Sequence, residues 1–241
     1  MLYRDASMIN LLNETFQKQL NIATPICHTF HPTPTEYLAS TFAPTEDLDA
    51  DTIYELFYQP CFPSFCPDDI LLDRLNTDII PPEMQNVIVD YFAKIRAQYQ
   101  NKHISFTLEG LNYFMETGRV TEIPDFMYSY LTPPQRLTML KAIVASVDDG
   151  SFTPHIIRSE RLTVPSPICI CAPNEHKVII YYFSPDKGQY IFSLQELSLV
   201  QAFYDFLTYL HESPLVYSLD ESKAMLHNVL EKYQQLSNFQ S

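Results

Sequence analysis

Apolar residues recur every three or four positions along five segments of this chain, the spacing that places them on one face of an α-helix. Such faces are nearly always buried, so we expect five amphipathic helices packed against a core. The five apolar faces consist of Met8, Leu11, Leu12, Phe16 and Leu20; Met84, Val87, Ile88, Tyr91, Phe92 and Ile95; Leu137, Leu140, Ile143, Val144 and Val147; Leu197, Val200, Phe203, Phe206, Leu207 and Leu210; and Leu226, Val229, Leu230, Tyr233 and Leu236.

Helix starts are marked by capping boxes, in which Ser or Thr precedes Glu or Gln by three positions and each satisfies a backbone N–H of the other. Two of these boxes predict helices over Leu194 to Leu210 and over Leu219 to Leu236. A shorter helix is expected over Leu108 to Glu116, with Gly118 as its C-terminal stop. The four pairs are Thr33 with Glu36, Thr132 with Gln135, Ser193 with Glu196, and Ser218 with Glu221.

Strand signals are concentrated between residues 151 and 192. The runs 168–171, 178–183 and 190–192 are separated by turn residues and predict an antiparallel meander, opened by a strand near His155 to Arg158. In residues 21–80, repeated prolines favour short helices and turns. The predicted fold class is α+β and mostly helical: a helical, acidic and proline-rich part over 1–150, then the meander and two amphipathic helices over 151–241. Whether the two parts share one core is left open.

Composition excludes several classes of protein. Hydrophobic residues make up 46% of the 241 residues, and no apolar run reaches the roughly 20 residues that a membrane span needs. No apolar signal-peptide core follows Met1, so we expect a soluble cytoplasmic protein. The four glycines lie too far apart for a phosphate-cradling loop, which disfavours the familiar nucleotide folds.

The net charge of −14 is unevenly distributed. Between Glu36 and Asp90 the chain has twelve acidic residues and one basic residue, Arg74. Such a surface repels phosphate backbones, so nucleic-acid binding through this chain alone is not expected. The acidic segment is either a solvated face or a docking surface for a basic partner.

Cysteine and histidine residues do not follow a known catalytic or zinc pattern. Cys27, His28 and His31 with Cys61 and Cys66 lack the two tight ligand pairs of a structural zinc site. We therefore assign no metal, no cofactor and no catalytic residue, and expect reduced, partly buried thiols. The alternative is an enzyme with an unrecognised site that uses Cys27, His28 or His31 with a carboxylate from Asp47 to Glu55.

Aromatic side chains give a second candidate for a binding surface. The chain has 16 Phe, 16 Tyr and no Trp, and several aromatics lie in the acidic, proline-rich region, of which six are singled out here. Aromatic side chains are enriched in binding hot spots. We predict that these six contact a partner, the alternative being that they fill the core beneath irregular loops. They are Tyr37, Tyr54, Phe57, Tyr58, Phe62 and Phe65.

The C-terminal segment resembles a known family. Phe203-Tyr204-Asp205-Phe206-Leu207, Leu210-His211-Glu212-Ser213 and Leu215-Val216-Tyr217-Ser218, followed by Leu219-Asp220-Glu221-Ser222, are similar to the C-terminal region of Firmicutes helix-turn-helix transcriptional regulators. The resemblance covers the final quarter of the chain and implies a bacterial protein with a regulatory, ligand-sensing or dimerising role. Residues 1–80 do not carry the expected DNA-binding motif. The nearest candidate for a helix-turn-helix elsewhere contains the turn after Gly118, which is too long and insufficiently basic for that motif.

These observations favour a non-catalytic regulatory or interaction protein that binds a protein partner, a second copy of itself or a small ligand. Two alternatives stay open: the unrecognised enzyme and a DNA-binding transcriptional regulator. A membrane partner is not expected.

Overall fold

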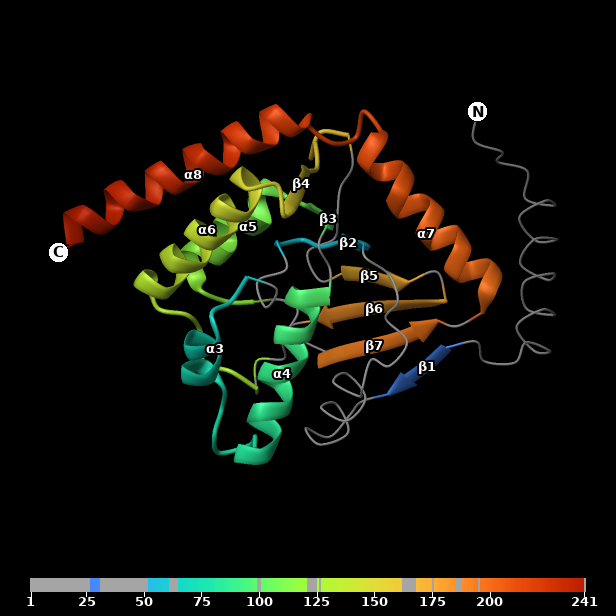
Figure 1. Cartoon of the computed structure of the whole chain (residues 1–241), viewed down its shortest axis with the longest axis horizontal. Coiled ribbons are helices and arrows are strands. Elements are labelled where there is room, and N and C mark those ends of the chain that lie inside the picture. Colours follow the sequence, from blue (N-terminus) through green and yellow to red (C-terminus); the bar gives the residue numbers. More distant parts are fainter. Residues whose placement is uncertain are drawn as a thin grey trace, which may run out of the picture.

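The computed structural model describes residues 27–30, 52–60, 65–98, 101–120, 125, 127–161, 168–174, 176–184, 188–194 and 196–240. Figure 1 shows the arrangement of the elements. The strands are β1 (Cys27–Phe30), β2 (Thr52–Leu56), β3 (Asn101–Phe106), β4 (Phe152–Ile156), β5 (Ile168–Asn174), β6 (Lys177–Ser184) and β7 (Gly188–Leu194). The helices are α3 (Asp68–Arg74), α4 (Pro82–Gln98), α5 (Leu108–Thr117), α6 (Pro133–Asp148), α7 (Leu197–Glu212) and α8 (Leu219–Gln240).

The strands form one mixed sheet in the order β1-β7-β6-β5-β2-β3-β4. The pairs β2–β3 and β3–β4 are parallel, and the remaining pairs are antiparallel. Parallel neighbours need long crossover connections. Helices α3 and α4 supply the first of these, between β2 and β3, and α5 and α6 supply the second, between β3 and β4. The α+β prediction is confirmed.

The two faces of the sheet lie against different helices. On one face, Ile104 and Phe106 of β3 and Phe152 and Ile156 of β4 join a large core with apolar residues of α3, α4, α5, α6 and α8. On the other face, α7 packs on β2, β5 and β6 through a smaller core. In Figure 1, α7 runs past the meander strands on the right, while α5, α6 and α8 gather on the left. The smaller core contains Leu56, Ile157, Ala172, Val178, Leu194, Val200, Leu207, Leu210 and Val216.

Most of the predicted helices are confirmed. Helix α5 ends at Gly118, whose φ of 74° lies in the left-handed region that glycine tolerates best. Helix α6 begins with the predicted capping box of Thr132 and Gln135. At α8 the Ser218 hydroxyl accepts from the Glu221 N–H, and the Glu221 carboxylate accepts from the Ser218 N–H. The predicted N-terminal helix and the Thr33 box lie outside the described residues.

The predicted start of α7 is wrong. Ser193 belongs to β7, and the helix begins at Leu197 rather than Leu194. Glu196 is itself the N-cap, and its carboxylate accepts from the N–H groups of Ser198 and Leu199. An N-cap side chain accepts hydrogen bonds from the free N–H groups of the first helical turn. Here the cap is acidic, and its negative charge also lies at the positive end of the helix dipole.

The meander of β5, β6 and β7 is confirmed, but the strand predicted to open it is not its neighbour. That strand is β4, which spans Phe152–Ile156 and pairs with β3 at the far edge of the sheet. Strands β2 and β3 separate it from the meander. Strands β1 and β2 also lie in residues 21–80, where only short helices and turns were expected. These segments are strands because they pair with distant parts of the chain. Short strands of mixed polarity carry little local signal in the sequence.

No helix among the described residues is long and apolar enough to span a membrane.

Candidate functional site

The six aromatics predicted to bind a partner occupy different environments. Phe57 and Phe65 are buried in the larger core, as the core-filling alternative expected of such residues. Tyr58 is half-buried and its ring lies 6.5 Å from that of Tyr113. Tyr54 lies within a group of histidines described below. Tyr37 and Phe62 lie outside the described residues.

Three histidines that are distant in the sequence meet on the α7 side of the sheet. His103 lies on β3 and His155 on β4, the parallel neighbour of β3. In that ladder His155 is paired with Ser105, two residues after His103, so both histidines point to the same face. His211 comes from the last turn of α7, which packs on that face. We call His103, His155 and His211 the histidine cluster.

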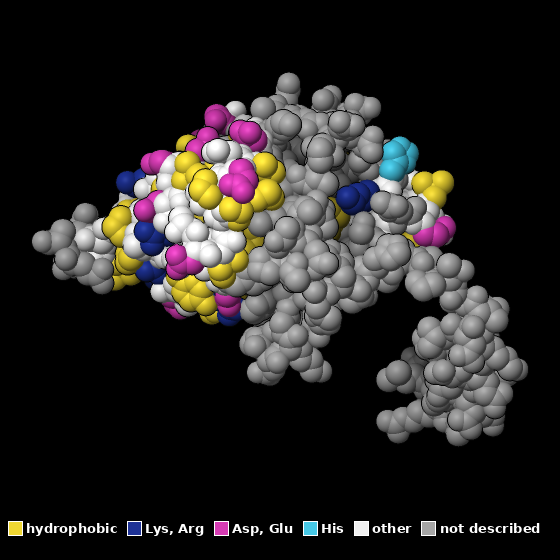
Figure 2. Space-filling model, turned by 90° about the horizontal axis from the view of Figure 1, so that it is seen from below, with side chains coloured by type: hydrophobic (Ala, Val, Ile, Leu, Met, Phe, Trp, Pro, Cys, Tyr) yellow, Lys and Arg dark blue, Asp and Glu magenta, His cyan; other side chains and the backbone are white. Residues whose placement is uncertain are grey.

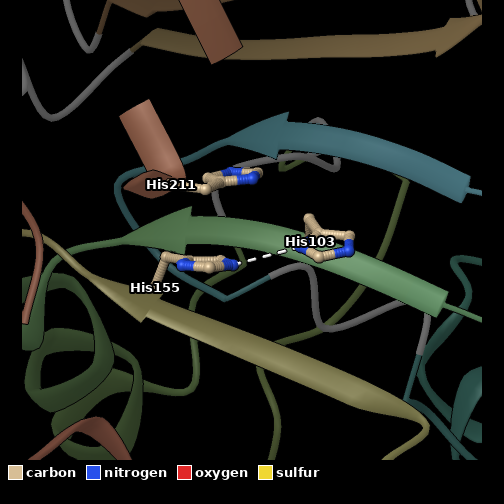
Figure 3. Close-up of side chains that lie close together, drawn as sticks. All are labelled: His103, His155 and His211. Atoms are coloured by element: carbon tan, nitrogen blue, oxygen red, sulfur yellow. Dashed lines mark hydrogen bonds between the residues drawn. The ribbon is translucent and has the colours of Figure 1, made fainter. Parts of the chain in front are cut away.

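The imidazole rings of the histidine cluster lie close together and nearly parallel. The His155 and His211 rings stack with their centroids 4.0 Å apart and their planes 5° apart. His103 Nδ1 and His155 Nε2 are joined by a hydrogen bond of 3.2 Å, in which one ring donates and the other accepts. Figure 3 shows the His211 ring lying over the other two, with that hydrogen bond dashed. One nitrogen from each ring lies within 4.8 Å of the other two.

Two tyrosines border the histidine cluster. The Tyr54 ring stacks against His103 at 5.2 Å and against His211 at 5.3 Å. Tyr204 of α7 meets Tyr54 edge to face, with centroids 5.2 Å apart. The ring contacts of the histidine cluster therefore extend through Tyr54 to Tyr204 on α7.

Burial keeps these imidazoles neutral. Desolvation lowers the pKa of His103. Desolvation, with repulsion from His103, lowers the pKa of His155 to about 4. Desolvation, with repulsion from the other two rings, lowers the pKa of His211 to about 2. A neutral imidazole has a free lone pair and is the form that binds metal ions.

His211 has unsatisfied hydrogen-bonding groups. Its Nδ1 and Nε2 are both buried, and neither has a hydrogen-bond partner among the residues that the structure describes. A buried polar atom without a partner costs about 1–3 kcal/mol. Buried side-chain nitrogens of this kind call for an explanation, and an ion is one of the usual ones.

The histidine cluster fits a transition-metal ion by donor type and spacing. Imidazole nitrogens suit Zn²⁺, Cu²⁺, Ni²⁺ and Co²⁺. Two ligands about 2.0–2.1 Å from a tetrahedral ion lie roughly 3.4 Å apart, somewhat closer than the 4.8 Å within which these nitrogens all fall. The lone pair of an imidazole lies in its ring plane, so nearly parallel rings must turn to point at one ion. The terminal torsion of histidine is broad and allows such a turn.

Sequence reasoning missed the histidine cluster. Its members are 52 and 56 residues apart, so no ligand-spacing pattern joins them. One local signal was present: in His103-Ile104-Ser105-Phe106, polar and apolar residues alternate as on a two-sided strand. The predicted candidates His28 and His31 do not contribute to it: His28 lies on β1, whose side chains are not described, and His31 lies outside the described residues.

Charged side chains on the described surface are mixed. Figure 2 shows Asp and Glu interspersed with hydrophobic side chains, and Lys and Arg scattered over the described part of that face. A duplex-binding surface gathers its basic residues into a patch or stripe. The prediction that this chain alone does not bind nucleic acid stays a prediction.

Comparisons with known proteins give no family. Neither a protein-family model nor a curated protein sequence matches this chain. A solved structure of TrmBL2, an archaeal chromatin protein described as showing a novel mode of DNA binding, aligns with a TM-score of 0.35 and 9% sequence identity. The alignment covers 88% of this chain and 62% of that chain. A likeness at this TM-score carries no argument about fold or function.

Proposed function

We propose that this chain is a metal-responsive regulatory protein, in which the histidine cluster binds a late first-row divalent ion such as Zn²⁺ and the ion acts by joining α7 to the sheet. The observation that carries the proposal is the pair of buried, unpartnered nitrogens of His211 beside two further imidazoles. A bound ion would coordinate one of these His211 nitrogens and offset part of the free energy that its burial costs.

The regulatory part of the proposal rests on where the ligands come from. His103 and His155 are fixed by the ladder between β3 and β4, whereas His211 is carried by α7. An ion bound to all three would link a helix to a sheet, so ion binding would favour the docked position of α7 by mass action. The resemblance of residues 195–230 to the C-terminal region of transcriptional regulators agrees with a sensing role for the same helix.

Replacing His211 with alanine is expected to weaken metal binding by at least about 100-fold, because even the loss of an outer-shell partner typically costs about 10–100-fold. The measurement is calorimetric titration of chelator-treated, full-length protein with Zn²⁺ and with Co²⁺. We expect one site in the wild type. A matched control is His227→Ala, since His227 is exposed on α8 and contacts Asp148. Wild-type protein that binds neither ion, or equal affinity in both variants, would overturn the proposal.

A metal-dependent hydrolase is the second candidate. The observation that favours it is the ligand count, because catalytic zinc sites use three protein ligands and keep a fourth position open. Zinc-loaded protein would then cleave an activated ester such as 4-nitrophenyl acetate, and the activity would be lost in His211→Ala but kept in His227→Ala. Zinc binding without that activity would leave the regulatory proposal and remove the enzyme.

A further inference from the structure

The histidine cluster supplies no negative charge to an ion. Three neutral imidazoles would leave the full double charge of a divalent cation in place. Among the described residues, no carboxylate makes a hydrogen bond or an ion pair with any of the three rings. An uncompensated charge in a half-buried site is costly, so an ion held here favours an anionic ligand at its next position.

Ser105 lies next to the histidine cluster and has a hydroxyl without a hydrogen-bond partner among the described residues. Its side chain is fully buried, at 0% exposure, and its Oγ has no hydrogen-bond partner among the described residues. Ser105 follows His103 by two positions on β3, so both point to the same face of the sheet. It is also the cross-strand partner of His155. A serine hydroxyl has one proton to donate, and a buried one that donates nothing is costly.

The surroundings restrict the size of a ligand. The three histidines are half-buried as residues, and both ring nitrogens of His211 are fully buried. Tyr54 and Tyr204 lie at the border of the cluster, and α7 covers the face on which it sits. These surroundings therefore favour a ligand of a few atoms over a polymer.

We propose that a small carboxylate completes the metal centre, with one carboxylate oxygen on the ion and a hydrogen bond from the Ser105 hydroxyl. This inference rests on the proposed metal site and names the ligand class that the regulatory protein senses. The ion supplies the attraction for a negative charge, and Ser105 selects a ligand that can accept a hydrogen bond.

The test is a titration of the Co²⁺-loaded, full-length protein with acetate, followed by the visible absorption of the cobalt. We expect the cobalt bands to shift and to saturate with acetate. Ser105→Ala should weaken acetate binding about tenfold, the effect of losing one hydrogen bond to a charged group, while Co²⁺ affinity stays within about twofold. Chloride at the same ionic strength controls for salt.

Ser222→Ala is the matched control variant. Ser222 is also fully buried, at 0% exposure, and its Oγ also has no hydrogen-bond partner among the described residues. It lies on α8, which carries none of the three histidines. We expect its acetate affinity to equal that of the wild type. Ser105→Gly, which also removes the hydroxyl and adds no metal ligand, replaces Ser105→Ala if the alanine variant does not give the wild-type circular dichroism spectrum.

The outcomes separate this inference from the function on which it rests. Cobalt bands that stay unchanged up to about 100 mM acetate would overturn the carboxylate proposal and leave the metal site standing. Equal acetate affinity in the wild type and in the Ser105 variants would remove Ser105 from the site. Protein that binds no Co²⁺ would overturn both proposals together.

Discussion

Replacing Gly110 with alanine is expected to destabilise the chain by about 4 kcal/mol or more, enough to unfold a domain of ordinary stability. Gly110 lies in the first turn of α5, and a Cβ built there would stand 1.7 Å from the Tyr58 carbonyl oxygen. That oxygen cannot move aside cheaply, because it accepts hydrogen bonds from both the N–H and the hydroxyl of Thr107. Thr107 is also the N-cap of α5.

Urea unfolding followed by circular dichroism is the measurement, with Gly150→Ala as the matched control. Gly150 has a φ of 81°, which an alanine adopts only with strain, but nothing lies within 4 Å of its added Cβ. The control should therefore lose only about 1–2 kcal/mol, the cost of backbone strain alone. A Gly110 variant as stable as the Gly150 variant would show that α5 can move away from residues 58 and 59.

The parts of the fold that could be predicted from the sequence are those with local causes. Helix α6 follows from a Thr-Pro start and an apolar stripe, and α5 ends at Gly118 because few other residues tolerate its φ of 74°. The meander strands alternate or run apolar between clear turn residues. In each case, neighbours within about seven positions determine the structure.

The rest of the fold depends on partners far along the chain. Strand β2 pairs with β3 on one side and with β5 on the other, about 50 and 116 residues away. Its five residues, Thr52–Leu56, include the strand-favouring types Thr, Ile and Tyr, but the run is short and mixes polar with apolar residues, so its neighbours alone do not identify it as a strand. The histidine cluster could not be predicted for the same reason, because its three members come together only when β3, β4 and α7 are all in place.

Lowering the pH from 6.5 to 5 is expected to reduce the free energy of unfolding by about 3 kcal/mol, through His155 and His211 alone. Burial and ring–ring repulsion lower the folded-state pKa to about 4 for His155 and to about 2 for His211, from an ordinary value of 6.5. Below pH 6.5 these histidines are therefore protonated in the unfolded chain but remain largely unprotonated in the folded chain. This stability is complete above pH 6.5 and is lost as the pH falls, at up to about 1.4 kcal/mol per pH unit for each group. His103, whose pKa burial also lowers, adds to the loss in the same direction.

Urea unfolding at intervals between pH 6.5 and 5 measures the slope, in a range where the carboxyl groups still contribute little. His211→Phe keeps an aromatic ring for the stack with His155 and removes the buried nitrogens, so its loss over this range should be smaller than that of the wild type by about 1.5 kcal/mol. His227→Phe is the control, because His227 is exposed and should leave the slope almost unchanged. A wild-type slope near zero, or the same slope in both variants, would mean that the imidazoles take up protons in the folded chain.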